Sequence, residues 1–235
     1  MTDSPNISAV VFDLDDTLYA ERDYVRSGYL AVAAHLQARL NRDGPWADWL
    51  WQRFLAGKVQ RAFNDLSDAF GLSLQEADIA ELINVYRTHR PRLRAFADIP
   101  PLLSLLRADY KLGLLSDGYL PTQALKLEAV GLERFFDAVL FTESLGRQAW
   151  KPATEGFEWI ARRLETPHAQ CCYVADNVAK DFIPPNRLGW RTIQYVRPGQ
   201  LYSSHRATGD ALPQTLVRSP EELRDAVRAV RRNPG

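Results

Sequence analysis

Short, predominantly apolar runs recur along the chain, and each run is followed by polar or small residues. The runs cover residues 9–12, 111–116, 138–141 and 171–175, and a further strand is predicted over residues 191–196, where apolar and polar residues are mixed. A continuous apolar run of this length is typical of a strand that is buried on both faces of a parallel sheet. Segments with helical spacing lie between the runs, at residues 99–106, 121–130, 154–164 and 180–188. Strands that alternate with helices indicate right-handed βαβ units, so the sequence predicts an α/β fold with a doubly wound parallel sheet.

The C-terminal part of the chain carries weaker signals. Residues 215–217 form a short apolar run that can add one more strand. Ser219 is followed by a proline, and a capping serine before a proline is a typical helix start. We expect this last helix to end in Arg228, Arg231 and Arg232, because positive charge suits a helix C-terminus.

A long stretch between the first and second predicted strands, residues 20–97, has no strand pattern. Helical spacing of apolar residues covers 23–40 and 65–70, with an aromatic-rich segment between them. The residues Ser73–Glu76 match a capping box, in which a serine and a glutamate three residues later accept from each other's backbone N–H. We expect the helix that follows this box to reach about residue 87. The stretch is long enough to form a small helical domain.

Length and composition are compatible with two domains. The chain has 235 residues, of which 46% are hydrophobic and 25% charged, and this ordinary balance supports a sizeable core. We therefore predict an α/β core formed by residues 1–19 and 98–235, and a helical domain formed by residues 20–97 that is inserted after the first strand.

Charge and hydropathy argue against two classes of partner. Lysine plus arginine equals aspartate plus glutamate at 29 each, which does not favour nucleic acid or an anionic membrane. No window approaches eighteen uninterrupted apolar residues, and residues 1–5 do not resemble a signal peptide.

Cys171 and Cys172 are adjacent, which is typical of packed thiols in a reducing compartment rather than of a disulfide. We expect a cytoplasmic protein, and the sequence carries no signal for an oligomeric state.

Polar residues cluster where the predicted strands end. Asp13 and Asp15 follow the first strand, Ser116–Gly118 closes the second, and Asp176 follows the fourth, while Lys151 precedes a helix. Taken singly, each has a structural explanation as a turn, a helix cap or a surface charge. The carboxyl ends of parallel strands lie at one edge of a sheet, where open α/β sheets bind their ligands. We therefore expect these residues to converge on one site.

The two acids after the first strand indicate a cation. Asp13 and Asp15 are two residues apart, so strand geometry turns both carboxylates to the same side. Two like charges that lie close together repel, and one of them holds a proton unless a cation neutralises the pair. A hard cation such as Mg²⁺ prefers oxygen ligands and removes this cost.

The order of these motifs resembles the haloacid dehalogenase superfamily of phosphohydrolases. The resemblance rests on four motifs, at Asp13–Thr17, Ser116–Gly118, Lys151–Pro152 and Asp176–Asp181, and it covers most of the chain. The inserted helical block resembles the small α-helical cap of one subgroup. One position departs from the family pattern, because the fourth motif usually carries glycine before its first aspartate and this chain has Ala175.

The resemblance implies roles for the main site residues. Asp13 is expected to attack phosphorus and form an aspartyl-phosphate. Asp15 is expected to protonate the departing oxygen and then deprotonate the attacking water, a role that needs a raised pKa. The metal ligands for Mg²⁺ are expected to be Asp13, the backbone carbonyl of Asp15 and Asp176. Ser116 is expected to donate to a phosphoryl oxygen, and Lys151 to supply positive charge to these oxygens.

The remaining motif residues are implied to support that set. Asp117 and Gly118 belong to the expected substrate-binding loop with the serine of the second motif. Asp181 is expected to orient the motif lysine or a metal-bound water, and Asn177 either does the same or caps the next helix. Thr17 is expected to form a hydrogen bond back to the backbone near the second acid of the first motif.

Three functions fit these residues. The leading hypothesis is Mg²⁺-dependent hydrolysis of a small phosphomonoester, of the nucleotide or sugar phosphate class, through an aspartyl-phosphate. The alternatives are a phosphomutase of the same superfamily and a non-catalytic binding domain that retains the fold. The dehalogenase reaction is disfavoured, because by resemblance those enzymes need no metal and lack the acid at Asp15. The implied partner is therefore a small phosphorylated metabolite.

Overall fold

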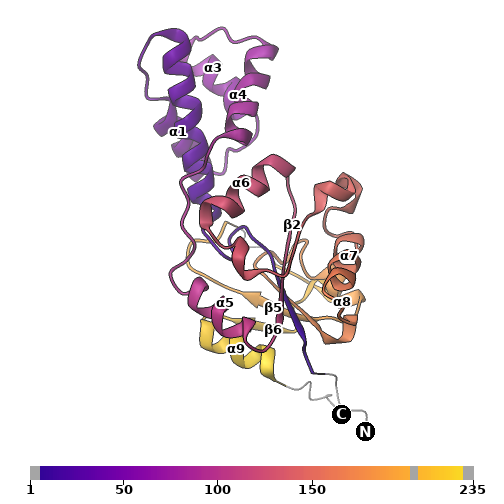
Figure 1. Ribbon diagram of the computed structural model, residues 1–235. Coiled ribbons are helices and arrows are strands. Elements are labelled where there is room, and N and C mark those ends of the chain that lie inside the picture. Colours follow the sequence, from indigo (N-terminus) through magenta and orange to yellow (C-terminus); the bar gives the residue numbers. More distant parts are fainter. Residues whose placement is uncertain (1–5, 202–205, 230–235) are drawn as a thin grey trace. The chain divides into compact units, whose positions relative to one another are not determined.

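The computed structural model describes residues 6–201 and 206–229. The chain divides into two compact units, of which the larger contains a six-stranded sheet in the order β3-β2-β1-β4-β5-β6 (Figure 1). The strands are β1 (Ala9–Phe12), β2 (Lys111–Ser116), β3 (Ala138–Phe141), β4 (Cys171–Ala175), β5 (Arg191–Tyr195) and β6 (Thr215–Val217). All neighbouring strands are parallel, which confirms the predicted α/β fold.

Helices cover both faces of this sheet (Figure 1). On one face α5 (Ile99–Arg107) and α9 (Pro220–Arg228) contact each other and the strands. On the other face α7 (Glu155–Arg163) packs on β2 and β3, and α8 (Ile183–Arg187) contacts β5. Side chains that alternate along the strands supply the core of this second layer, as expected for strands buried on both faces.

The strand order places a topological switch point beside β1. The chain continues from β1 towards β2 on one side and is later joined by β4 on the other, with Phe12 opposite both Leu114 and Val174. Asp13 extends this pairing by one residue, since its N–H donates to the carbonyl of Val174 at 2.9 Å. Ligands of open α/β sheets bind outside the carboxyl ends of the strands at such a point. The fold therefore delivers the first acidic motif to a position suited to ligand binding.

The second unit, Arg22–Leu93, is helical and has its own core. Its helices are α1 (Glu21–Leu40), α2 (Trp46–Leu55), α3 (Ala62–Phe70) and α4 (Glu76–Thr88). Trp46, Leu50 and Leu66 are buried at its centre, so one of the tryptophans is a core residue. Residues 20–97 are all described and contain no strand. Even α1, with 20 residues, lacks the apolar character of a membrane span, and no other helix among the described residues has it.

The predicted start signal of one helix is wrong. The helix α4 begins at Glu76, but its N-cap is Gln75, whose backbone N–H donates to Asp78 Oδ2 at 2.8 Å. Ser73 instead has a φ of 52°, in the left-handed region, so it forms part of the preceding turn. The last described helix, α9, ends at Arg228. The predicted ends at positions 231 and 232, and residues 1–5, lie outside the described residues.

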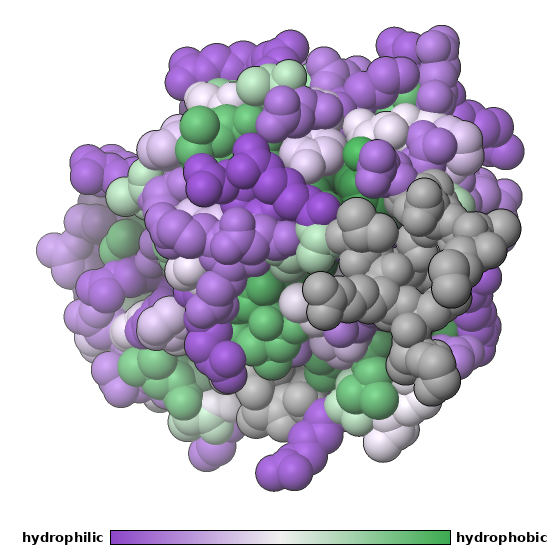
Figure 2. Space-filling view, turned by 90° about the horizontal axis from the view of Figure 1, so that it is seen from below, coloured by the Kyte–Doolittle hydropathy of each residue, from purple (hydrophilic) through white to green (hydrophobic). Residues whose placement is uncertain are grey.

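Polar groups dominate the surface seen from below, where small apolar areas are separated by hydrophilic side chains (Figure 2). Exposed leucines such as Leu105 and Leu216 are 55% and 42% accessible. Single exposed apolar side chains of this kind are normal on a folded protein and need no partner to explain them.

The two cysteines are expected to be unreactive in the native protein. Cys171 and Cys172 are free and buried in β4, and burial raises the pKa of each thiol to about 12. Because the thiolate is the reactive species, a disulfide reagent such as DTNB should titrate close to no thiol in buffer. The same reagent should titrate both thiols in guanidinium chloride. Rapid reaction of DTNB with the native protein would contradict the buried placement of the two cysteines.

Candidate active site

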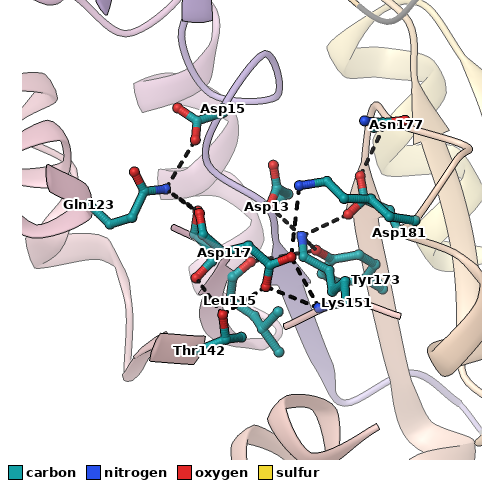
Figure 3. Close-up of polar contacts among 12 residues, drawn as sticks. Asp13, Asp15, Leu115, Asp117, Gln123, Thr142, Lys151, Tyr173, Asn177 and Asp181 are labelled. Carbon is teal, nitrogen blue, oxygen red and sulfur yellow. Dashed lines mark hydrogen bonds and ion pairs between the residues drawn. The ribbon is translucent and has the colours of Figure 1, made fainter. Parts of the chain in front are cut away.

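Asp13 and Lys151 form the centre of the site at the carboxyl end of β1. Lys151 Nζ lies 2.7 Å from Asp13 Oδ1 and 2.7 Å from Asp181 Oδ1 (Figure 3). It also donates to the hydroxyl of Tyr173 at 2.9 Å, and its side chain is fully buried. Burial disfavours the ammonium, but Asp13 and Asp181 outweigh it and hold the pKa of Lys151 well above its usual value. The site therefore contains a permanently charged, fixed cation.

Three buried carboxylates gather around this lysine. Asp13, Asp176 and Asp181 each place an oxygen within 4.8 Å of the others. Burial raises the pKa of Asp13 to about 6, because the attraction of Lys151 does not compensate for it. Burial, followed by repulsion from Asp181 and Asp13, also holds the pKa of Asp176 well above the ordinary range. The acids crowd each other in a way that a bound cation would relieve.

One of these carboxylates has an unused oxygen. Asp176 Oδ2 is buried and has no hydrogen-bond partner among the described residues. Asp181, in contrast, uses Oδ1 for Lys151 and Oδ2 for the backbone N–H of Asn177, at 2.7 and 3.0 Å. A buried polar oxygen without a partner is costly, and Asp176 Oδ2 is therefore suited to binding a cation. The chemistry and placement of Asp13 and Asp176 thus fit a hard divalent cation, while Asp181 orients the lysine.

Asp15 lies apart from this cluster and is held by a different set of donors. Lys126 Nζ contacts both of its carboxylate oxygens, at 2.8 and 3.0 Å. Gln123 Nε2 donates to Asp15 Oδ2 at 3.0 Å, and the Tyr19 hydroxyl donates to Oδ1 (Figure 3 shows the Gln123 contact). Burial alone would raise the pKa of Asp15, but the charge of Lys126 and these hydrogen bonds lower it below its usual value. The raised pKa that we expected for Asp15 is therefore wrong.

The second motif forms a tight loop next to Asp15. Gln123 Nε2 also donates to Ser116 Oγ at 2.7 Å and to the Asp117 carbonyl at 2.8 Å. Ser116 Oγ accepts this bond, so its own O–H hydrogen is available to a ligand. Gly118 has a φ of 133°, and a Cβ there would lie 2.9 Å from the Gln123 side chain. Glycine is therefore required for both its backbone angle and this close approach.

Asp117 joins the second motif to the third. Its carboxylate accepts from Thr142 Oγ1 at 2.7 Å and from the backbone N–H of Lys151 at 3.1 Å (Figure 3). Lys180 Nζ lies 3.8 Å from the same carboxylate. The side chain of Asp117 is therefore occupied within the protein, where it fixes the backbone from which Lys151 projects.

Two smaller expectations are resolved by the contacts. Thr17 Oγ1 is buried and has no hydrogen-bond partner in the part of the chain that the structure describes, so the predicted bond to the backbone near Asp15 is not formed. Lys126 and Gln123, on α6 (Leu120–Val130), hold Asp15 instead. Asn177 Oδ1 accepts from the backbone N–H of Ala179 at 3.0 Å, within the turn after β4. The N-cap of α8 is Phe182, so the expectation that Asn177 caps the next helix is wrong. Ala175 is an ordinary strand residue opposite Gln194 and has no positive φ, so glycine is not needed there.

The sequence analysis missed four residues at the site, which are Gln123, Lys126, Tyr173 and Lys180. The first two lie on α6 (Leu120–Val130), on the buried face that also carries Leu127. Polar residues at the helical spacing of an inward-facing apolar stripe were the available signal. Tyr173 lies inside a buried strand, where an aromatic residue is ordinary, so the pattern gave no reason to select it.

Comparisons with known proteins place the chain in a class. The family model for haloacid dehalogenase-like hydrolases matches residues 7–188. The chain therefore belongs to the haloacid dehalogenase-like hydrolase family, and within it to the phosphatases.

Individual relatives agree with this class. A glyceraldehyde 3-phosphate phosphatase from Methanopyrus kandleri is 30% identical, over 94% of this chain and 97% of the relative. A solved phosphatase of the family from Thermococcus onnurineus is 26% identical, with a TM-score of 0.62 and coverage of 95% and 100%. The magnesium-bound hydrolase YfnB from Bacillus subtilis, at 22% identity, shares the fold with a TM-score of 0.69 and coverage of 96% and 100%.

Proposed function

We propose that this phosphatase hydrolyses a small phosphomonoester of the sugar phosphate class through an aspartyl-phosphate on Asp13, with Mg²⁺ as its cofactor. The observation that carries the proposal is the arrangement around Asp13. Its carboxylate lies at the switch point of the sheet, 2.7 Å from the buried ammonium of Lys151 and close to the unpartnered oxygen of Asp176. Phosphoryl transfer requires an aligned nucleophile and fixed positive charge, and we assign these roles to Asp13 and Lys151.

Three groups of the chain would hold the cation. They are the carboxylates of Asp13 and Asp176 and the backbone carbonyl of Asp15, an all-oxygen set that suits Mg²⁺. When bound, the cation neutralises charge on the phosphoryl oxygens and on the acids that surround them. Asp181 and Lys151 remain bonded to each other beside this set.

The side chains can carry both chemical steps. An Asp13 oxygen attacks phosphorus and the bond from phosphorus to the ester oxygen breaks. Asp15, whose pKa rises when the anionic phosphoryl group lies beside it, takes up a proton on substrate binding and gives it to that oxygen. A water molecule then attacks phosphorus and gives a proton to Asp15, and the bond from phosphorus to the Asp13 oxygen breaks. This step restores the Asp13 carboxylate and releases inorganic phosphate. Ser116 donates its hydroxyl hydrogen to a phosphoryl oxygen, and Lys151 stabilises the charge that builds on these oxygens.

Substrate class is inferred from relatives. The curated relative at 30% identity, covered over almost its whole length, is named for glyceraldehyde 3-phosphate. This favours a short sugar phosphate over a nucleotide. We further propose that the helical unit Arg22–Leu93 acts as the cap that selects the substrate.

The test is a panel of phosphate esters assayed for release of inorganic phosphate. The panel contains glyceraldehyde 3-phosphate, longer sugar phosphates, nucleoside monophosphates and an aryl phosphate, each with Mg²⁺ and with EDTA. We expect release with Mg²⁺, fastest for the short sugar phosphates, and loss of nearly all of it in EDTA. Release that needs a bisphosphate primer would favour the phosphomutase. No release from any ester would favour a non-catalytic domain.

A further inference from the structure

Asp15 is fixed by a buried lysine that the motifs of the sequence do not include. Lys126 projects from α6, its side chain is 6% exposed, and its ammonium bridges both oxygens of the Asp15 carboxylate. A buried lysine is costly unless an acid compensates for it, so the placement of Lys126 depends on Asp15. The Asp15 side chain is itself 19% exposed, which leaves it within reach of a ligand.

The contacts define both the position and the rotation of the carboxylate. The ammonium of Lys126 lies 2.8 and 3.0 Å from the two oxygens, so it is nearly equidistant from them. Gln123 Nε2 then contacts Oδ2 from the same helix, and the Tyr19 hydroxyl contacts Oδ1 from the segment after β1. Proton transfer in a transition state requires a donor held within a fraction of an ångström and about 10–20° of the productive geometry. Donors on both oxygens provide that restraint.

We infer that Lys126 is a positioning residue for proton transfer by Asp15, so that it governs the protonation of the leaving group and the activation of water. The inference rests on the proposed function, because it assigns Lys126 a part in the hydrolysis proposed for this site. Lys126 acts through Asp15 and does not contact the reacting atoms. Its loss leaves the nucleophile Asp13 and the cation Lys151 in place, since neither has a contact with Lys126 among the described hydrogen bonds.

Leaving-group dependence tests this assignment. A poor leaving group such as the glycerol of glycerol phosphate must be protonated as it departs, whereas 2,4-dinitrophenolate departs without a proton. General acid catalysis contributes about 10²–10⁴-fold. We expect Lys126→Met to lower kcat/KM for glycerol phosphate by about 100-fold. The same variant should keep kcat/KM for 2,4-dinitrophenyl phosphate within about threefold of wild type, a change small against the general-acid contribution.

The second step gives an independent readout. When water activation is impaired, the aspartyl-phosphate from 2,4-dinitrophenyl phosphate accumulates, and rapid mixing should show a burst that approaches one dinitrophenolate per site. Lys111→Met is the matched control, because Lys111 is exposed at the opposite end of β2 and contacts the Leu164 carbonyl. It should behave as wild type with both esters.

A double-mutant cycle decides whether Lys126 acts through Asp15. Asp15→Asn and Asp15→Asn/Lys126→Met should have the same kcat/KM for glycerol phosphate, because a residue that only positions Asp15 has nothing left to position. A further loss in the double variant would overturn the inference, as would an equal loss for both esters in Lys126→Met. If Lys126→Met alone unfolds, the comparison of Asp15→Asn with the double variant still decides the question, because the double variant leaves neither charge of the ion pair buried alone. An inactive wild type on all esters would refute the proposed function itself.

Discussion

Asp13→Asn is expected to abolish phosphate release from every ester that the wild type hydrolyses, with a loss on the order of 10⁴-fold or more, the scale seen when a nucleophile is removed. An amide oxygen is a poor nucleophile and cannot form the acyl phosphate. The substitution keeps the shape of the side chain and an oxygen that can accept from Lys151, which lies 2.7 Å from Asp13 Oδ1 in the wild type. The measurement is steady-state release of inorganic phosphate with Mg²⁺ present.

Stability separates loss of chemistry from loss of fold. Asp13→Asn removes one of three crowded negative charges, so the melting temperature of the metal-free protein should stay unchanged or rise. The matched control is Asp109→Asn, an exposed aspartate that pairs with Arg228 on the surface and should retain full activity. Turnover of the Asp13→Asn variant within tenfold of wild type would mean that another group attacks phosphorus.

Lys151→Met should destabilise the protein more than any other single lysine substitution discussed above. The change leaves Asp13 and Asp181 buried without their shared cation, and breaking a buried ion pair costs about 3–5 kcal/mol. In a chain of this size each kcal/mol lowers the melting temperature by roughly 2–4 °C. A thermal melt without divalent metal gives the comparison, with Lys111→Met as a control that should melt close to wild type.

The loss of stability caused by Lys151→Met should grow as pH rises. The pKa of Asp13 in the folded protein is already raised to about 6 with Lys151 present, and removing that lysine raises it further. A carboxyl whose pKa is higher in the folded state binds its proton more tightly there, so its contribution favours folding at low pH and is lost as pH rises through the folded pKa. The deficit in melting temperature should therefore be larger at pH 8 than at pH 5. Equal deficits would show that packing, not charge, dominates.

The fold was predictable because the pattern that identifies it is strong. Continuous apolar runs between helical segments leave few arrangements other than a parallel sheet, and the predicted runs 111–116, 138–141 and 171–175 coincide with strands. The convergence of Asp13, Lys151 and Asp176 follows from that topology, since parallel strands end at a common edge.

The details that escaped prediction depend on side-chain direction. In the sequence, Gln123 and Lys126 are ordinary helix residues. They can be recognised as site residues only when the buried face of α6 is known, and packing on the sheet rather than local sequence determines that face. The capping box of α4 is formed by Gln75 and Asp78 instead of by Ser73 and Glu76, because Ser73 has a left-handed backbone conformation in the loop before the helix. Local sequence patterns predict that a helix or strand exists better than they predict the residues at which it begins and ends.

The side-chain NH2 of Gln123 lies within hydrogen-bonding distance of three acceptors and shares its two hydrogens among them. The acceptors are the Asp15 carboxylate, the Ser116 hydroxyl and the Asp117 carbonyl. Exchange for glutamate would set oxygen against oxygen in all three directions, and a shorter side chain would release them together. Efforts to broaden the range of esters that this enzyme accepts should therefore keep Gln123 and diversify residues elsewhere. A change at position 123 would disturb Asp15, Ser116 and the backbone at Asp117 together.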